Sequence, residues 1–217
     1  MEKKINILVA DDHPIFRKGL VELISDVPQL FVCGEAEDGN SAIELIQLTK
    51  PSIAILDINM PGMNGFDVAK EVRSLKLPVF IIFLTMYNEE ELFNKAMDLG
   101  VRGYILKECA AKDILDCILS VAKGKHYISP VISDYLVNRS MVLKINEERK
   151  SAIEKLTPME KQILSLIAED KTSKEIADKF FISIRTVDNH RMNICNKLSI
   201  HGSNALLKFA LENKHHF

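Results

Sequence analysis

Four apolar runs in the first half of the chain each lead into a polar residue that could take part in phosphate chemistry. The polar residues are Asp11 and Asp12 after residues 5–10, Asp57 after 53–56, Thr85 after 79–84, and Lys107 after 104–106. Short apolar runs separated by helical stretches indicate buried parallel strands. In an open α/β sheet the ligand crevice lies at the carboxyl ends of such strands, so we expect these side chains to meet at one edge of a sheet.

This set of residue types fits a cation-assisted phosphoryl site. Three carboxylates held close together repel one another, so some must be protonated or share a cation, and oxygen ligands favour Mg²⁺. Asp57 is the best candidate nucleophile because it ends a central strand alone, whereas Asp11 and Asp12 are better placed as metal ligands. Lys107 would neutralise charge on the phosphoryl oxygens. Any one of these could be an ordinary polar residue at a strand end, but four strand ends with matching roles favour the phosphoryl site.

Residues 1–124 contain the elements that must position this site. Helical periodicity follows each strand-like run, over residues 14–26, 40–48, 65–75, 89–99 and 111–123, and residues 30–34 form the remaining strand. Five βα units predict an α/β domain with a five-stranded, doubly wound parallel sheet and right-handed crossovers. We expect the largely polar residues 125–152 to be a linker to a second domain over residues 153–217.

Composition narrows the class of protein. The 217 residues, 47% of them apolar, suffice for one or two globular domains. The net charge of −2 is uneven, because residues 1–124 are acidic and residues 151–217 mildly basic, which favours a polyanion as partner of the second domain. The scattered cysteines argue against a disulfide framework or a zinc site. Without a signal-peptide pattern or an apolar stretch of roughly 18 residues, we expect a cytoplasmic protein with no membrane association.

The pattern from residue 156 onward is purely helical. Thr157 and Glu160 have the spacing of a capping box, with Pro158 at the first helical position. Further helices are expected over residues 173–180, 184–198 and 203–212, with a tight turn at 181–183. Two helices joined by a tight turn, inside a small all-α unit of four helices, are typical of a helix-turn-helix domain.

The helix expected over residues 184–198 has an apolar face and a polar face. The apolar face contains Val187, Ile194 and Leu198, and the polar face contains Arg185, Asp188, Asn189, Met192 and Asn196. If the polar face enters the major groove, Asn189 can pair with adenine, Met192 can touch a thymine methyl group and Asp188 can accept from cytosine N4. A solvated helix face without a partner is the alternative.

The polar face has little positive charge, so contacts to DNA phosphates are expected from the residues around it. These are Lys171, Lys174, Thr186, His190, Arg191, Lys197 and Lys208. Because non-specific affinity depends on neutralising phosphates with Lys and Arg, we expect it to be modest.

Asp11-Asp12, the segment 57–65, Thr85, Tyr104 and Lys107 together resemble the receiver domain of bacterial two-component response regulators, a flavodoxin-like fold. The resemblance covers residues 4–124 and implies that Asp57 accepts a phosphoryl group from the phosphohistidine of a sensor histidine kinase. It also implies that Asp12 and Asp57 bind Mg²⁺ directly, Asp11 through water, and Asn59 with its backbone carbonyl. Lys107 would contact the phosphoryl oxygens, Thr85 would swing its hydroxyl toward them, and Tyr104 would follow Thr85 inward.

The segments 156–160, 176–177, 183–191 and 197–198 resemble the DNA-binding domain of the NarL/FixJ group, also called LuxR-type. The resemblance covers residues 153–214 and implies a transcription regulator, not an enzyme, that binds double-stranded DNA as a homodimer on paired half-sites. Together the two resemblances predict a DNA-binding response regulator that is switched by phosphorylation of Asp57.

Two other functions remain open at this level. A Mg²⁺-dependent phosphohydrolase would also use Asp57 as nucleophile, but such enzymes commonly place a second acid two residues later, where this chain has Asn59. That function would also leave the helix-turn-helix unexplained. A regulator that binds DNA without phosphorylation would leave the acidic site unexplained instead.

Overall fold

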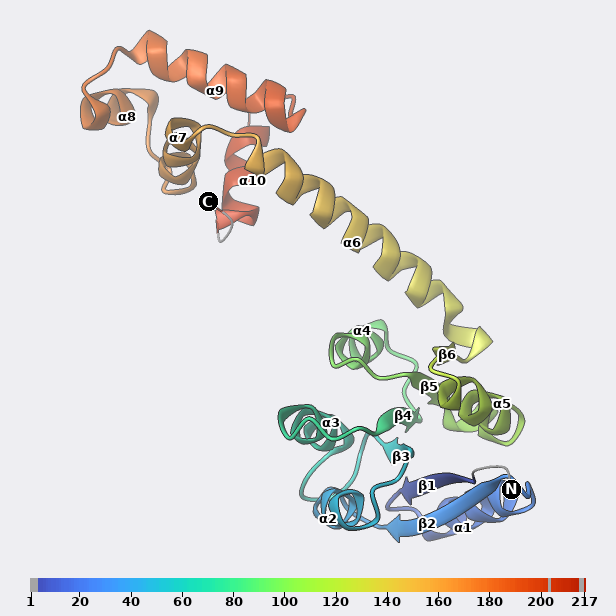
Figure 1. The fold of residues 1–217 in the computed structure, drawn as a ribbon. Helices are drawn as coiled ribbons and strands as arrows, with labels where there is room; N and C mark the ends of the chain where they lie inside the picture. The colour runs from blue at the N-terminus through green and yellow to red at the C-terminus, as the bar shows by residue number, and fades with distance from the viewer. Residues whose placement is uncertain (1–3, 203, 215–216) are drawn as a thin grey trace. The chain divides into compact units, whose positions relative to one another are not determined.

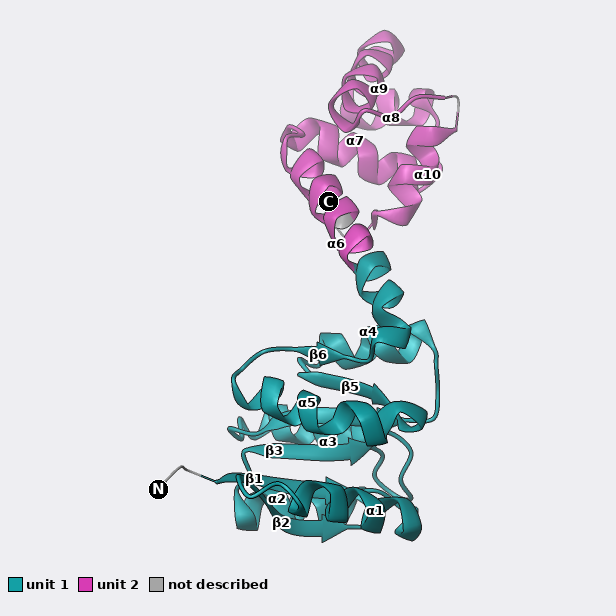
Figure 2. Cartoon of the chain, turned by 90° about the vertical axis from the view of Figure 1, so that its right-hand side faces the viewer, with its two compact units in different colours: residues 1–139 teal, residues 140–217 magenta. Residues whose placement is uncertain are grey.

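The computed structural model describes residues 4–202, 204–214 and 217. The chain divides into unit 1, residues 1–139, and unit 2, residues 140–217, which are coloured separately in Figure 2. Each unit has its own apolar core. Across the described residues, no helix combines the length and the apolarity that crossing a membrane requires.

Unit 1 is built on a parallel sheet with the strand order β2-β1-β3-β4-β5-β6. The strands are β1 (Ile5–Ala10), β2 (Leu30–Ala36), β3 (Ile53–Asp57), β4 (Phe80–Thr85), β5 (Gly103–Leu106) and β6 (Tyr127–Ile128). The direction of the strand order reverses at β1, so the crevice typical of such sheets lies at the carboxyl ends of β1 and β3. The prediction of a doubly wound parallel sheet is confirmed.

The predicted number of five strands is wrong, because the described residues form a sheet of six. The additional strand, β6, is only two residues long and pairs with β5 in parallel, with Gly103 opposite Tyr127 and Tyr104 opposite Ile128. Both residues of β6 are half-buried, and so short a segment lacks the apolar run by which the other strands could be recognised.

Helices cover both faces of the sheet (Figure 1). One face packs against α1 (Pro14–Ser25) and α5 (Ala110–Ala122), and the other packs against α2 (Gly39–Thr49), α3 (Gly65–Ser74) and α4 (Glu90–Asp98). Side chains alternate between the faces of a strand, so in β1 Ile7 and Val9 join the core under α1 and α5, whereas Leu8 and Ala10 join the other core.

Residues 125–152, expected to be a linker, have regular structure through most of their length. After β6 come the short 3₁₀ helix η2 (Pro130–Ile132) and the long helix α6 (Ser133–Glu154). The division between the two units falls within α6, after Arg139. The α6 sequence contains no glycine or proline and is rich in good helix formers, which explains why it is helical although its apolar residues do not form one stripe.

Unit 2 contains α7 (Pro158–Ala168), α8 (Ser173–Phe180), α9 (Ile184–Leu198) and α10 (Ala205–Glu212) around one core. The capping box predicted at the start of α7 is confirmed, since Thr157 Oγ1 accepts from the Glu160 backbone and the Glu160 carboxylate accepts from the Thr157 backbone. A second capping box joins Thr172 and Glu175 at the start of α8. The bounds of α8 and α9 match the prediction, whereas the last helix was expected to start at residue 203, which lies outside the described residues.

Candidate functional site

The Lys107 ammonium lies between two of the predicted carboxylates at the carboxyl edge of the sheet. Lys107 Nζ is 2.7 Å from Asp11 Oδ2 and 2.7 Å from Asp57 Oδ2. Asp11 follows β1, Asp57 ends β3, and Lys107 begins the 3₁₀ helix η1 (Lys107–Cys109) after β5. All three residues are buried, so this cluster is held by the strand ends and not by mobile surface chains.

Burial and charge act in opposite directions on the pKa values of this cluster. Burial raises the pKa of the Asp57 carboxyl above its ordinary value, although the hydrogen bond and charge of Lys107 counteract part of that effect. Burial alone would lower the pKa of Lys107, but its hydrogen bonds with Asp11 and Asp57 outweigh burial and raise the pKa above its ordinary value. Lys107 therefore stays positively charged at neutral pH.

Four side chains could together hold a metal ion. Ligand atoms of Asp11, Asp12, His13 and Asp57 lie within 4.8 Å of one another. With the three carboxylates ionised, the Lys107 ammonium compensates one negative charge and leaves two, which suits a divalent cation. Carboxylate oxygens are the ligands that Mg²⁺ prefers, so the donor set fits Mg²⁺.

His13 is a member of this cluster that sequence reasoning missed. Its Nδ1 lies 2.8 Å from Asp12 Oδ1, and its backbone N–H donates to Asp11 Oδ1 at 2.9 Å. The side chain is largely exposed, and its position directly after Asp11-Asp12 is the only sequence signal that could have pointed to it. An imidazole suits Mg²⁺ less well than a carboxylate, so we assign His13 a contact to Asp12 rather than a ligand role.

Asn59 lies in the loop between β3 and α3, next to Asp57. Its backbone N–H is 3.3 Å from Asp57 Oδ1, so it orients the free oxygen of that carboxylate. The side chain of Asn59 is exposed. The structure therefore brings the Asn59 backbone to the cluster through this hydrogen bond.

Thr85 ends β4, which pairs with the β3 strand of Asp57, and Tyr104 lies on β5, on the far side of β4. Thr85 is fully buried, and its Oγ1 accepts a hydrogen bond of 3.0 Å from the Tyr87 backbone. Tyr104 is also buried, and its ring meets Phe93 of α4 edge-to-face at 5.5 Å between centroids. Burial, followed by the charge of Glu89, raises the pKa of the Tyr104 phenol far above its ordinary value, so the phenol is neutral. Tyr104 is already buried in this structure, and its expected movement with Thr85 stays a prediction.

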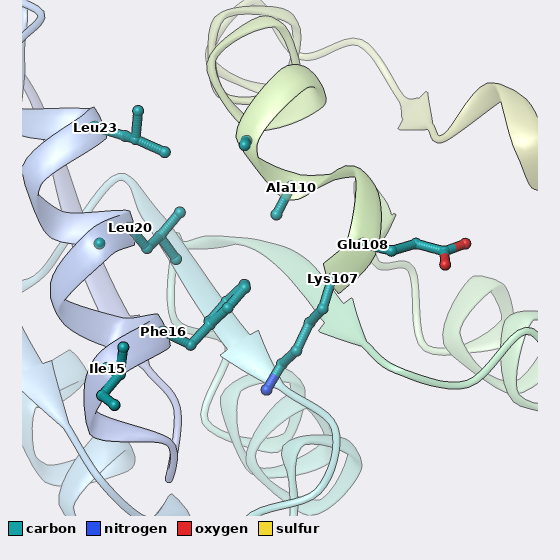
Figure 3. A pocket seen from close by; sticks show the side chains of 9 residues that line it. Ile15, Phe16, Leu20, Leu23, Lys107, Glu108 and Ala110 are labelled. Atoms are coloured by element: carbon teal, nitrogen blue, oxygen red, sulfur yellow. The ribbon is translucent and has the colours of Figure 1, made fainter.

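An apolar groove lies beside Lys107, between α1 and the start of α5 (Figure 3). It has a volume of about 410 Å³ and is lined by Ile15, Phe16, Gly19, Leu20, Leu23, Lys107, Glu108, Ala110 and Ala111. Figure 3 shows Lys107 extending past Phe16, whose ring centroid is 4.9 Å from Lys107 Nζ, while Glu108 points to the other side. The Phe16 ring thus adds a cation–π contact to the two ion pairs of the ammonium.

The second predicted site is the polar face of α9. Arg185, Asp188, Asn189 and Met192 are exposed along this helix, and Thr186 and His190 are half-buried. Val187 and Ile194 are fully buried and Leu198 is half-buried, as expected for the opposite face. Asp188 Oδ1 accepts a hydrogen bond of 2.8 Å from Ser173 Oγ at the start of α8, so this exposed carboxylate also links the two helices.

Two predicted phosphate-binding lysines have different surroundings. Lys174 is exposed near the start of α8. Lys197 is partly exposed, but its Nζ lies 2.7 Å from Oε2 of the buried Glu160. The same Glu160 carboxylate closes the capping box of α7. Burial would raise the pKa of Glu160, but the hydrogen bonds of Lys197 and Thr157 outweigh burial and hold that pKa below its ordinary value. Lys197 therefore fixes the end of α9 to α7.

Replacing Glu160 with glutamine should destabilise unit 2 by about 1–2 kcal/mol at neutral pH, because the Lys197 ammonium loses its charged partner. The folded pKa of Glu160 lies below its ordinary value of 4.5, so its contribution to stability is present above pH 4.5 and is lost as the pH falls through the folded pKa. Urea unfolding of the wild type and E160Q should therefore differ at pH 7 and converge on acidification. The exposed Glu175, in the capping box of α8, is the matched control, and an equal loss for E175Q would contradict this role.

Comparison with known proteins matches both units to described families. The family model "Response regulator receiver domain" matches residues 7–119, and "Bacterial regulatory proteins, luxR family" matches residues 154–210. The nitrate/nitrite response regulator protein NarL of Escherichia coli K12 is 34% identical over 199 residues, which cover 92% of this chain and 91% of NarL. The transcriptional regulatory protein LiaR of Bacillus subtilis is 33% identical over 197 residues, covering 90% and 92% of the two chains.

A solved structure with a similar fold is RcsB of Salmonella enterica serovar Typhimurium, bound to promoter DNA in the presence of the phosphomimetic BeF₃⁻. It is 29% identical, the match covers 95% of this chain and 98% of that chain, and the TM-score is 0.58. The similarity therefore extends over both units of the chain.

Proposed function

Because the chain belongs to the NarL/FixJ-type response regulators, the DNA-binding regulators of two-component systems, we propose that Asp57 is its phosphoacceptor and that phosphorylation switches DNA binding by unit 2. The observation that carries this proposal is the position of Lys107, whose ammonium is 2.7 Å from both Asp11 and Asp57 in a buried cluster. A sensor histidine kinase is the phosphodonor that this family implies, and the cytoplasm, where the DNA lies, is the proposed location.

The phosphoryl transfer makes use of the environment of Asp57. An Asp57 oxygen forms a bond to phosphorus while the nitrogen–phosphorus bond of the donor's phosphohistidine breaks, which leaves an acyl phosphate on Asp57. Lys107, which stays charged, would turn from the Asp57 carboxylate to the phosphoryl oxygens. The Asn59 backbone N–H, which donates to Asp57 Oδ1, would hold the carboxylate in place during the transfer.

The residues that would hold Mg²⁺ are Asp11, Asp12 and Asp57, together with the backbone carbonyl of Asn59. When bound, the metal supplies positive charge to the phosphoryl oxygens. The excess of two negative charges and the oxygen-rich donor set described above support this assignment of the Mg²⁺ ligands. Thr85, whose hydroxyl is buried beside Asp57, would donate to the phosphoryl group, and the neutral Tyr104 would occupy the space next to it.

Unit 2 would bind double-stranded DNA with the exposed face of α9 in the major groove. Asn189 and Met192 are proposed to contact bases, with Arg185 on the same face of the helix, and Thr186, His190 and Lys174 are proposed to contact the backbone. Asp188 would position α8 through Ser173 as well as accept from cytosine, and Lys197 would orient α9 through Glu160 besides any phosphate contact. The RcsB complex with promoter DNA supports this use of the domain, and a homodimer on paired half-sites follows from the family.

A phosphohydrolase is the less supported alternative. Asn59 occupies the position two residues after Asp57 where such an enzyme would need a second acid, and its amide cannot donate a proton as an acid does. The two relatives described above are a nitrate/nitrite response regulator and a transcriptional regulatory protein. We therefore propose a switch that holds its phosphoryl group on Asp57 rather than an enzyme that turns over substrate.

The test compares the wild type with D57A in two measurements on the full-length protein. With a small phosphodonor such as acetyl phosphate and Mg²⁺, the wild type should incorporate phosphate and bind DNA fragments, selected from genomic DNA, more tightly than without the donor. D57A should do neither, while its affinity for DNA without the donor stays that of the wild type. The half-buried Asp67, whose carboxylate pairs with Lys70 three residues later on α3, provides the control, and D67A should behave as the wild type. Phosphate incorporation by D57A, or equal DNA affinity of the wild type with and without the donor, would refute the proposal.

A further inference from the structure

Three aromatic rings connect the interior of unit 1 with the first turns of α6. Tyr104 of β5 meets Phe93 of α4 edge-to-face, with 5.5 Å between ring centroids and 80° between planes. Phe93 also contacts Tyr135 of α6, with 5.9 Å between centroids and 47° between planes. Tyr104 and Phe93 are fully buried and Tyr135 is half-buried, so the row runs from the core to the helix surface.

A second connection runs through the segment between β4 and α4. Thr85 Oγ1 accepts from the Tyr87 backbone at 3.0 Å, and the next residue, Asn88, accepts from the Tyr135 hydroxyl through its carbonyl at 3.1 Å and through Oδ1 at 3.0 Å. Thr85 and Tyr104 are the two residues proposed to respond to phosphorylation. Their separate connections, one polar and one aromatic, meet at Tyr135.

One more contact, on the next turn of α6, holds this helix on α4. Arg139 lies four residues after Tyr135, on the same side of the helix, and its guanidinium is 2.6 Å from Asp98 Oδ1. It also donates to the backbone carbonyl of Asn94 at 3.3 Å. Because these contacts of Tyr135 and Arg139 lie on α4 or on the segment before it, a shift of that segment changes how the start of α6 is held.

We propose that Tyr135 is the residue through which α6 responds to the state of Asp57. When Thr85 turns its hydroxyl toward a phosphoryl group, the Tyr87 N–H loses its partner and the segment with Asn88 is released to move. That movement withdraws the acceptors of the Tyr135 hydroxyl, and a shift of the Tyr104 ring changes its edge-to-face contact with Phe93. The start of α6 thereby loses the contacts that hold it on α4, and this part of the helix leads to unit 2. This inference rests on the function proposed for Asp57.

The experiment measures DNA affinity of the full-length protein with and without acetyl phosphate and Mg²⁺, and compares the ratio of the two affinities between variants. Y135A should reduce this ratio about fivefold or more, with unchanged phosphate incorporation at Asp57. Y135F, which keeps the ring and loses only the hydroxyl, should reduce it less. The neighbouring Leu136 is exposed on the same turn, and L136A, the control, should leave the ratio unchanged.

A second readout separates signalling from simple anchoring of the helix. Hydrogen exchange of residues 133–142 should increase in the wild type when the phosphodonor is added, and should already be increased in Y135A without it. An unchanged affinity ratio in Y135A, or an equal drop of both affinities with no change in their ratio, would overturn the proposal. If the wild type itself shows no phosphodonor effect, the function proposed for Asp57 fails, and this inference fails with it.

Discussion

Replacing Gly65 with alanine is expected to destabilise unit 1 by about 3 kcal/mol and to abolish phosphorylation of Asp57, because the added methyl group has no space. A Cβ at this position would lie 2.3 Å from the Asp57 carbonyl oxygen and 3.0 Å from the Ile58 Cα, both of which are backbone atoms. The Gly65 N–H also donates to the Ile58 carbonyl at 2.9 Å, so α3 cannot move away without breaking that hydrogen bond. Urea unfolding and phosphate incorporation from acetyl phosphate measure the two effects.

Gly19 provides the matched control within the same unit. It lies inside α1, and a Cβ there would meet no atom within 4 Å. G19A should therefore stabilise the unit by about 0.5–1 kcal/mol through helix propensity and leave phosphorylation intact. A G65A protein that is as stable as the wild type and phosphorylated at the same rate would show that the strand end carrying Asp57 tolerates displacement.

Replacing Lys107 with methionine should have the second large effect, on stability as well as on function. The variant leaves Asp11 and Asp57 buried without their shared cation, which should cost about 3–5 kcal/mol at neutral pH. Phosphate incorporation should be lost too, because no ammonium remains to neutralise the phosphoryl oxygens. The exposed Lys112 on α5 is the control, and K112M should change neither property.

The pH dependence of the stability loss in K107M shows whether the unpaired carboxylates cause it. Burial already holds the pKa of Asp57 above its ordinary value in the wild type, and removing Lys107 raises that pKa further. A carboxyl whose folded pKa is raised contributes stability below its unfolded pKa, and this contribution is lost as the pH rises through the folded value. The deficit of K107M should therefore be large at pH 7, shrink on acidification, and be reduced by millimolar Mg²⁺. A deficit that is independent of pH and Mg²⁺ would point to lost packing against Phe16 instead.

Local pattern was sufficient to predict most elements and the acidic cluster. The run from Ile5 to Ala10 gave the bounds of β1, and the periodicity between Ser183 and Leu198 gave those of α9. Parallel strands bring their carboxyl ends to one edge, so the convergence of Asp11, Asp57 and Lys107 follows from the order of the strands.

Features that depend on distant contacts could not be predicted in this way. Lys197 was expected among the phosphate contacts, but its ammonium meets Glu160, 37 residues earlier in the chain, and only the packing of α7 on α9 brings the two together. The contacts of Tyr135 with Phe93 and Asn88 have the same character, since nothing in the sequence around α6 indicates which face rests on α4. β6 is too short to leave any periodic signal.

The short strand β6 sets the point at which the receiver can be separated from the rest of the chain. Tyr127 and Ser129 donate backbone hydrogen bonds to the carbonyls of Arg102 and Tyr104, and the Ser129 hydroxyl donates to the buried Asp113. A fragment cut at residue 124 would lose these partners and leave β5 as an open sheet edge, which invites pairing with other chains. An isolated receiver that is to stay monomeric should therefore extend at least to Arg139, the end of unit 1.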